Sequence, residues 1–207
     1  LIDQIRSTAQ KYYGATYQLL GESVSTYDMK VIISKDNKVV TWLAILGIGL
    51  LILITFRNLL LPVIMVLVIE SAIWINLSVP YFMETKLVYI AYLILSSIQL
   101  GATVDYAILY SDRYMGFRQT LGKKEAIIHT TQATMTSIIT SASILGIAGF
   151  CMGLVSSNFA ISQIGILIGR GALLSAGAVL FALPALLHIF DGPIKKLNFK
   201  SRKEEVS

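Results

Sequence analysis

Asp105 is the residue whose type and position most directly indicate chemistry in this sequence. It stands in the motif Gly101-Ala-Thr-Val-Asp105-Tyr106, near the end of an apolar run from residue 87 to residue 110. This run is long enough to cross a bilayer. A carboxylate inside a membrane span costs free energy and is normally kept only where it is used, often in a proton relay. The sequence therefore predicts that Asp105 takes up and releases a proton.

Two further ionisable side chains lie inside apolar runs, Glu70 and Arg170. Burial disfavours the ionised form of Asp105 and a nearby Arg170 favours it, so the two effects could balance near neutral pH. The alternative is a permanent salt bridge between Asp105 and Arg170 that only fixes helix packing. We favour the proton role, because three such charges cannot all be neutralised in pairs. Glu70 is expected to be structural rather than functional, either protonated or bonded to a neighbouring helix.

Hydroxyl side chains crowd the next apolar run, which begins near Thr131. Thr136 and Thr140 lie one helical turn apart, as do Ser137 and Ser141. Hydroxyl groups can donate a hydrogen bond to a carboxylate or hold water beside it, so this face could support Asp105. They can equally bond to carbonyl groups of their own helix and allow close packing. The sequence leaves these two alternatives open.

Glycines at a spacing of four residues predict close helix contacts. Gly149-x-x-x-Gly153 and Gly165-x-x-x-Gly169 form two such small-residue faces within apolar runs. Gly101, at the start of the Asp105 motif, is assigned to the same packing role. A structural function is the simplest interpretation for all five glycines.

The composition is that of a polytopic membrane protein. Of the 207 residues, 55% are hydrophobic and only 14% are charged, with a mean hydropathy of +0.71, which is too apolar for an ordinary soluble domain. The sequence has no catalytic triad, no clustered metal ligands and no phosphate-binding loop. We therefore expect no enzyme, no metal and no cofactor.

Five apolar runs are each long enough to cross about 30 Å of hydrocarbon as a helix. The sequence therefore predicts an all-α, five-helix membrane domain over residues 39–190. The predicted spans are residues 39–56, 59–79, 87–110, 131–155 and 159–188.

Residues 1–38 are polar and are expected to lie outside the membrane. Their pattern predicts a helix that Gly14 ends, a short strand at 15–20 and a second helix that continues into the first span. Such a small α/β segment cannot bury a core alone. We expect it to be the end of a larger extramembrane domain.

Positive charge is distributed unevenly between the two ends of the spans. One side has Arg57, the basic loop 111–130 and the basic tail 191–207, whereas the loops on the other side hold only Lys86. The positive-inside rule predicts a cytoplasmic tail and extracytoplasmic residues 1–38. The formal net charge of +5 follows from this asymmetry and requires no nucleic acid. The loop 111–130 is either a short interfacial helix on anionic lipid or a solvated loop.

The order of these motifs resembles the MMPL family of the resistance/nodulation/division (RND) transporter superfamily. The motifs that carry the resemblance are Gly101-Ala-Thr-Val-Asp105-Tyr106, Arg113-Tyr114, the Ser/Thr-rich span, Gly169-Arg170-Gly171 and Leu183-Pro184-Ala185-Leu186. The resemblance implies that residues 39–190 are the five closing helices of such a transporter. It also implies that residues 1–38 are the end of its second porter domain.

The same resemblance implies a proton-motive-force-driven exporter of lipids or hydrophobic compounds in the cell membrane. Asp105 and Tyr106 would form one part of a proton relay, completed by an equivalent pair from the N-terminal half, which is expected to be missing here. The implied partners are membrane lipids, that missing half and a hydrophobic substrate, while an oligomer remains an open alternative. Two other functions stay open at this point: a sterol-sensing-like lipid sensor or receptor domain, and an accessory motor for protein secretion.

Overall fold

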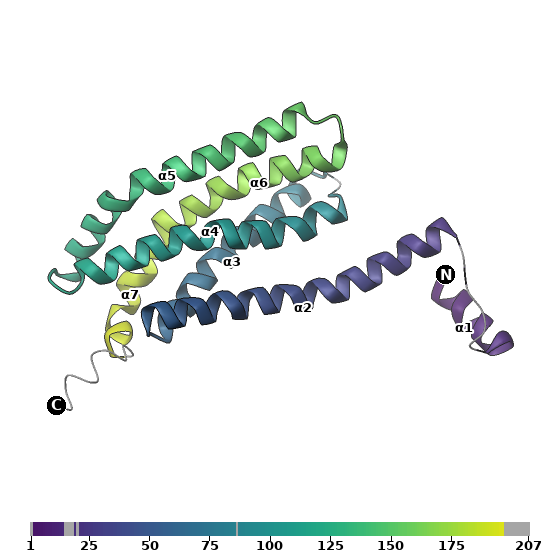
Figure 1. The fold of residues 1–207 in the computed structure, drawn as a ribbon, viewed down its shortest axis with the longest axis horizontal. Coiled ribbons are helices and arrows are strands. Elements are labelled where there is room, and N and C mark those ends of the chain that lie inside the picture. The colour runs from purple at the N-terminus through teal and green to yellow at the C-terminus, as the bar shows by residue number, and fades with distance from the viewer. Residues whose placement is uncertain (1, 15–18, 20, 86, 197–207) are drawn as a thin grey trace. The chain divides into compact units, whose positions relative to one another are not determined.

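All the secondary structure elements that the described residues form are helices. The computed structural model describes residues 2–14, 19, 21–85 and 87–196 (Figure 1). The elements are α1 (Ile2–Tyr13), α2 (Glu22–Phe56), α3 (Leu60–Phe82), α4 (Tyr89–Phe117), α5 (Lys123–Val155), α6 (Phe159–Gly177), the π-helical turn η1 (Ala178–Ala182) and α7 (Leu183–Lys196). The predicted all-α class is confirmed over these residues.

The chain divides into two compact units, Leu1–Leu43 and Ala44–Ser207. Helix α2 continues without a break from Glu22 to Phe56, as the sequence predicts for the helix that enters the first span. Polar residues ended the apolar run in the sequence, but they do not end the helix.

In the first unit, α1 ends where the sequence predicts. Gly14 has φ = +64°, a left-handed conformation that glycine adopts at little cost, and this stops the helix. An ion pair between Arg6 and Asp28 joins α1 to α2 within this unit. The strand predicted at 15–20 lies, apart from Leu19, outside the described residues. The α/β character expected for this segment therefore has no support, and its described part is helical.

Five helices of the described chain are long and apolar enough to cross a membrane, as the sequence predicts. Their candidate spans are Val39–Phe56, Leu60–Phe82, Ala91–Phe117, Lys123–Val155 and Phe159–Ile194. The third, fourth and fifth spans are longer than the apolar runs suggested. Charged residues at their ends can remain helical, because long side chains reach from the helix to the membrane interface.

The region 111–130 is the clearest case of this extension. It was expected to be an interfacial helix or a solvated loop, and both expectations are wrong. Helix α4 continues to Phe117 and α5 begins at Lys123, so only the short link 118–122 joins them. Buried Tyr114 and Ala126 continue the inward faces of the two helices across this region.

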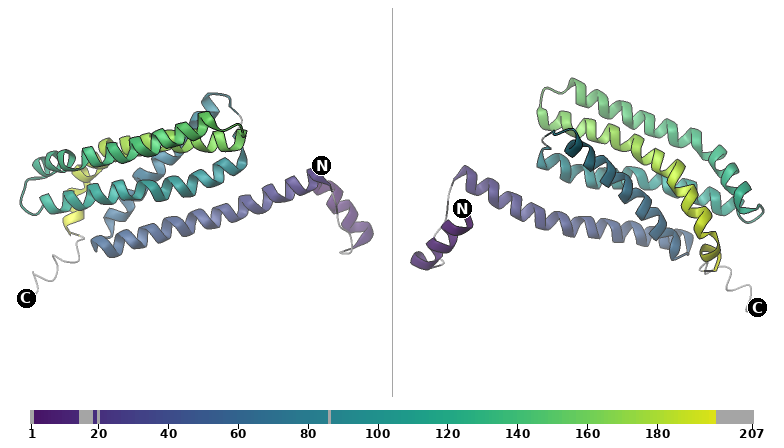
Figure 2. Two further views of the ribbon diagram at one scale, coloured as in Figure 1. Left: turned by 45° about the horizontal axis from the view of Figure 1, so that its top comes forward. Right: turned by 180° about the vertical axis from the view of Figure 1, so that it is seen from behind.

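The last span contains a wider turn and a bend rather than a terminator. Pro184 has no N–H to donate to the carbonyl group of Leu180, and its ring would clash with that carbonyl in a regular α-helix. The π-helical turn η1 precedes it, and the N–H of Leu183 bonds to the carbonyl oxygen of Ala178. The helix bends at this place and continues as α7 (Figure 2). Pro184 therefore lies at a bend of this span and does not end it.

Helices α5 and α6 lie side by side at very short distance (Figures 1 and 2). A Cβ atom added to Gly149 would lie 2.5 Å from the backbone nitrogen of Gly169, and one added to Gly165 would lie 2.6 Å from that of Gly153. These distances leave no room for a side chain, so the two glycine faces allow backbone contact. Gly101 differs, because it is exposed and has nothing within 4 Å of its Cβ position.

A core cluster joins the helices of the second unit. Its largest side chains come from α2, α3, α4 and α7, and they include Ile52, Leu61, Met65, Tyr110, Tyr114 and Leu187. Helix α4 thus has one face in the core and another face outside it. The side chains that alternate between these two faces form the candidate site.

Candidate functional site

Asp105 lies on the exposed face of α4. Gly101, Asp105, Asp112 and Gly116 are all exposed, and their spacing places them along one side of the helix. Among the described residues, nothing forms a hydrogen bond or an ion pair with the Asp105 carboxylate. A carboxylate in this position is open to water or to a partner on that side of the bundle.

Tyr106, the next residue, turns inward. Its side chain is 8% exposed, and it belongs to the core cluster. Its hydroxyl group has no hydrogen-bond partner in the described part of the chain. The Asp-Tyr pair therefore has one member outside the bundle and one member at the edge of its core.

The hydroxyl groups of α5 divide into two sets. Thr130 and Thr134 are buried and donate hydrogen bonds to the carbonyl oxygens of Ala126 and Thr130, at 2.7 and 2.8 Å. The other set, predicted to support Asp105, is exposed: Thr136, Ser137 and Thr140. No hydrogen bond between this exposed set and Asp105 is present among the described residues.

Arg170 on α6 bonds to Asn76 on α3 and not to Asp105. Its Nε donates to Asn76 Oδ1 at 2.7 Å, and its Nη2 donates to the carbonyl oxygen of Asn76 at 3.0 Å. The alternative of an Asp105–Arg170 salt bridge is therefore not realised in the structure. The fixed position of the guanidinium comes from an amide side chain and a main-chain carbonyl.

Glu70 is partly buried and bonds within its own helix. It accepts a hydrogen bond from Trp74 Nε1, one turn further along α3, at 3.2 Å. The sequence left two alternatives, a protonated Glu70 or a bond to a neighbouring helix; the bond that the structure shows is to a residue of the same helix.

A buried polar network that the sequence did not predict connects α3, α4 and α6. Asn76 Nδ2 donates to Gln99 Oε1 and to the carbonyl oxygen of Leu167, both at 2.9 Å. Gln99 Nε2 in turn donates to Ser175 Oγ at 3.0 Å. Gly171 makes room for the two amides, since a Cβ atom there would lie 2.7 Å from Asn76 Nδ2. The only trace of this network in the sequence was one amide side chain in each of two apolar runs, Asn76 in one and Gln99 in the other.

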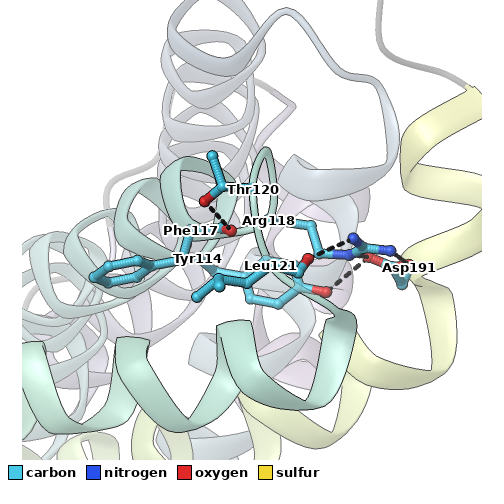
Figure 3. Close-up of polar contacts among 6 residues, drawn as sticks. All are labelled: Tyr114, Phe117, Arg118, Thr120, Leu121 and Asp191. Atoms are coloured by element: carbon cyan, nitrogen blue, oxygen red, sulfur yellow. Dashed lines mark hydrogen bonds and ion pairs between the residues drawn. The ribbon is translucent and has the colours of Figure 1, made fainter.

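A second polar cluster lies where the link between α4 and α5 meets α7 (Figure 3). Arg118 binds the carboxylate of Asp191 with two hydrogen bonds, Nε to Oδ1 at 2.8 Å and Nη2 to Oδ2 at 2.9 Å. Tyr114 donates its hydroxyl proton to Asp191 Oδ1 at 2.8 Å. The hydrogen bond to Asp191 raises the pKa of Arg118 above its ordinary value. The guanidinium therefore stays charged and neutralises Asp191.

Asn58 holds the hairpin between α2 and α3 near the same end of α7. Its Nδ2 donates to the carbonyl oxygen of Ile194 at 2.6 Å, and its Oδ1 accepts from the N–H of Leu60 at 2.9 Å. The side chain thus satisfies one free N–H at the start of α3 and one carbonyl of α7.

In the described part of the chain, no group of three or more His, Cys, Asp or Glu side chains could hold a metal ion.

Five candidate membrane helices define a polytopic membrane protein. The sequence model of the MMPL family matches residues 1–205. The chain therefore belongs to the MMPL family and is a membrane transporter of the RND kind. No curated protein matches it.

Proposed function

We propose that this chain is the C-terminal half of a proton-motive-force-driven exporter of lipids or hydrophobic compounds, in which Asp105 carries the proton. The observation that carries the proposal is an exposed carboxylate within a candidate span, without a partner among the described residues. Hydrocarbon cannot stabilise a carboxylate, so this face of α4 needs water or another protein surface. A carboxylate in contact with water can exchange its proton.

The exposed hydroxyl groups of α5 likewise need water or another protein surface beside them. Thr136, Ser137 and Thr140 place polar atoms on the surface of a helix that crosses the membrane. Polar groups in spans normally face a protein interior or a water-filled cavity rather than lipid. The partner that we infer for these surfaces is the N-terminal half of the same transporter.

Tyr106 is the second relay residue in this proposal. Its hydroxyl group has no described partner and lies at the edge of the core, next to Asp105 in the chain. Resemblance to the family implies that it meets the equivalent aspartate of the N-terminal half. Arg170 takes a positioning role, because it is engaged by Asn76, and Glu70 has a structural role within α3.

The proposal includes an orientation in the cell membrane. The link between α4 and α5 is flanked by four cations, Arg113, Arg118, Lys123 and Lys124, and this positive charge supports a cytoplasmic position for that end. Residues 1–38 are then extracytoplasmic. Membership of a transporter family favours this function over a lipid sensor or a secretion motor.

The test is the substitution Asp105→Asn in the complete transporter. Asparagine has nearly the same shape and hydrogen-bonding capacity but cannot take up a proton, so it separates titration from packing. Export per folded molecule under an imposed pH gradient should fall by about 100-fold or more, as expected when an acid–base group is lost. Thermal stability in detergent should stay unchanged, since no described residue bonds to Asp105.

Asp112→Asn is the matched control. Asp112 is exposed on the same side of α4, close to the link with α5. Its substitution removes an equal charge from the same face, and export should stay at the level of the unmodified protein. Full export by the Asp105→Asn protein would end the proposal.

A further inference from the structure

Three tyrosines on the buried side of α4 follow Asp105 toward the link with α5. We propose that Tyr106, Tyr110 and Tyr114 form a hydroxyl column that conducts the proton between Asp105 and Asp191. This inference rests on the proposed function, and it names the route by which the Asp105 proton reaches one end of the bundle. In the orientation proposed above, that end is the cytoplasmic one.

The geometry of the column follows from its spacing. The three tyrosines are four residues apart on one helix, and their exposed fractions are 8%, 0% and 0%. Four residues of α-helix rise by about 6 Å. Two hydrogen bonds of about 2.8 Å cover nearly the same distance, and the proposal therefore includes one water molecule between successive hydroxyl groups.

The hydroxyl groups of the two inner tyrosines have partners suited to proton transfer. Tyr110 Oη and Thr131 Oγ1 are 2.8 Å apart, and either oxygen can be the donor. Tyr114 donates to Asp191 Oδ1 at 2.8 Å. A hydroxyl pair that can reverse its donor and acceptor can accept a proton from one side and release another proton on the other side.

Ser111 lies between Tyr110 and Tyr114 in the chain and supplies an independent indication. Its Oγ is fully buried and has no hydrogen-bond partner within the described chain. A buried hydroxyl without a protein partner is costly, and ordered water is the usual way in which folded proteins satisfy such a group. Ser111 therefore marks a place where a bridging water would be held.

Each transfer leaves the column neutral. Asp105 releases its proton to a water molecule, and that water passes one of its own protons to the next hydroxyl oxygen. At each hydroxyl, one O–H bond forms with the incoming proton while the existing O–H bond breaks toward the next acceptor. Asp191 receives the last proton and releases it to water outside the span. No tyrosinate and no other reactant are needed.

The end of the column is built to remain an acceptor. Asp191 is 7% exposed, and its Oδ1 receives hydrogen bonds from both Tyr114 and Arg118 (Figure 3). The Arg118 guanidinium favours the ionised carboxylate, which returns after each proton has left. Asp191 thus couples the buried hydroxyl groups to the polar end of the bundle.

The test measures proton entry rather than export. The complete transporter is reconstituted in liposomes that contain a pH-sensitive dye, and a pH gradient is applied in H2O and in D2O. Tyr110→Phe and Tyr114→Phe keep the aromatic rings and remove only the hydroxyl groups. The rate of proton entry per folded molecule should fall at least about tenfold in each variant. The solvent isotope effect should increase, because proton transfer becomes rate-limiting.

Two controls protect this measurement. Tyr81→Phe removes a hydroxyl group from an exposed tyrosine at the end of α3 and should leave the rate unchanged. The double variant Tyr110→Phe/Thr131→Val removes both members of the hydroxyl pair and leaves no unpaired polar atom. This double variant should slow proton entry per folded molecule as much as Tyr110→Phe does. It therefore tests the column even if Tyr110→Phe alone folds poorly.

The outcomes separate the column from the proposed function. If Asp105→Asn is inactive while the tyrosine variants keep the unmodified rate, the column is wrong and the role of Asp105 stands. If the rates fall without an increase in the isotope effect, the tyrosines only pack the core and the column is also wrong. If Asp105→Asn conducts at full rate, the proposed function fails and the column fails with it.

Discussion

Arg170 donates its Nε proton to Asn76 Oδ1 at 2.7 Å, and this contact joins two residues that are 94 positions apart in the chain. The guanidinium is held in the membrane domain by an amide and a main-chain carbonyl rather than by a carboxylate. This arrangement keeps Arg170 away from Asp105 as a permanent counter-ion. Arg170 and Asp105 therefore do not form an ion pair in this structure.

Asn76→Leu should strongly destabilise the protein. Leucine has the same branching at Cγ but no polar atoms, so it removes the acceptor for Arg170 Nε and the donor for Gln99 Oε1 and leaves both atoms unpaired. The expected loss is roughly 2–4 kcal/mol of unfolding free energy. Denaturant titration in detergent measures it. Ser78→Ala is the control, because Ser78 is exposed and bonds only within its own helix; an equal loss in both variants would contradict the role of the network.

Gly165→Ala should push α5 and α6 apart. The added methyl group would lie 2.6 Å from the backbone nitrogen of Gly153 and 2.7 Å from the carbonyl oxygen of Gly149. Because backbone atoms cannot move aside as a flexible side chain can, we expect a loss of roughly 1–3 kcal/mol, measured by thermal unfolding. Gly47→Ala adds the same group where nothing lies within 4 Å, and this control should unfold no earlier than the unmodified protein.

Arg118 and Asp191 should show a strong energetic coupling. A double-mutant cycle with Arg118→Gln and Asp191→Asn should give an interaction energy of roughly 1–3 kcal/mol, since the contact has two hydrogen bonds and is largely buried. An additive cycle would show that the pair makes no net contribution to stability.

The same pair predicts a flat dependence of stability on pH. The folded-state pKa of Arg118 is raised, so its contribution is complete below the unfolded-state pKa and is lost only as the pH rises through the folded-state value. Both values lie far above neutral pH. The coupling energy should therefore stay constant from about pH 6 to about pH 9, where an arginine does not titrate. A decline within that range would assign the pH dependence to another group.

Cysteine labelling can establish the orientation. Cys151 is exposed, so the test starts from Cys151→Ala. A membrane-impermeant reagent added to intact cells should label Glu84→Cys, in the link after α3, and should not label Gln119→Cys, in the link between α4 and α5. The positive-inside distribution is the reason for this expectation. The opposite labelling pattern would reverse the proposed topology.

Local sequence signals were sufficient for the helices and their approximate limits. Gly14 ends α1, and the apolar runs mark the five candidate spans. Local signals gave the wrong helix limits where charged residues suggested a loop but the spacing of apolar residues continued the helix. The region 111–130 looked like a loop because of its charges, although Tyr114 and Ala126 continue the buried faces of α4 and α5.

Partners from distant parts of the chain were not visible in the sequence. A single neutral amide in an apolar run, such as Asn76 or Gln99, is a weak signal by itself. It becomes informative only when the fold brings the two amides to 2.9 Å and adds Arg170. Asp191 likewise resembled part of a basic tail until α7 placed it against Arg118.

Hydropathy and motif order were enough to predict the membrane class, the five candidate spans and the family, because both are properties of the chain read along its length. By contrast, the packing of the helices was needed to show that Asp105 faces out of the bundle, that Tyr106 faces in and that Arg170 bonds to Asn76. The physical reason is that the rotation of each helix about its own axis depends on its neighbours. Packing of the glycine faces of α5 and α6, and of the tyrosine face of α4, sets those rotations, and it combines contacts from residues far apart in the chain.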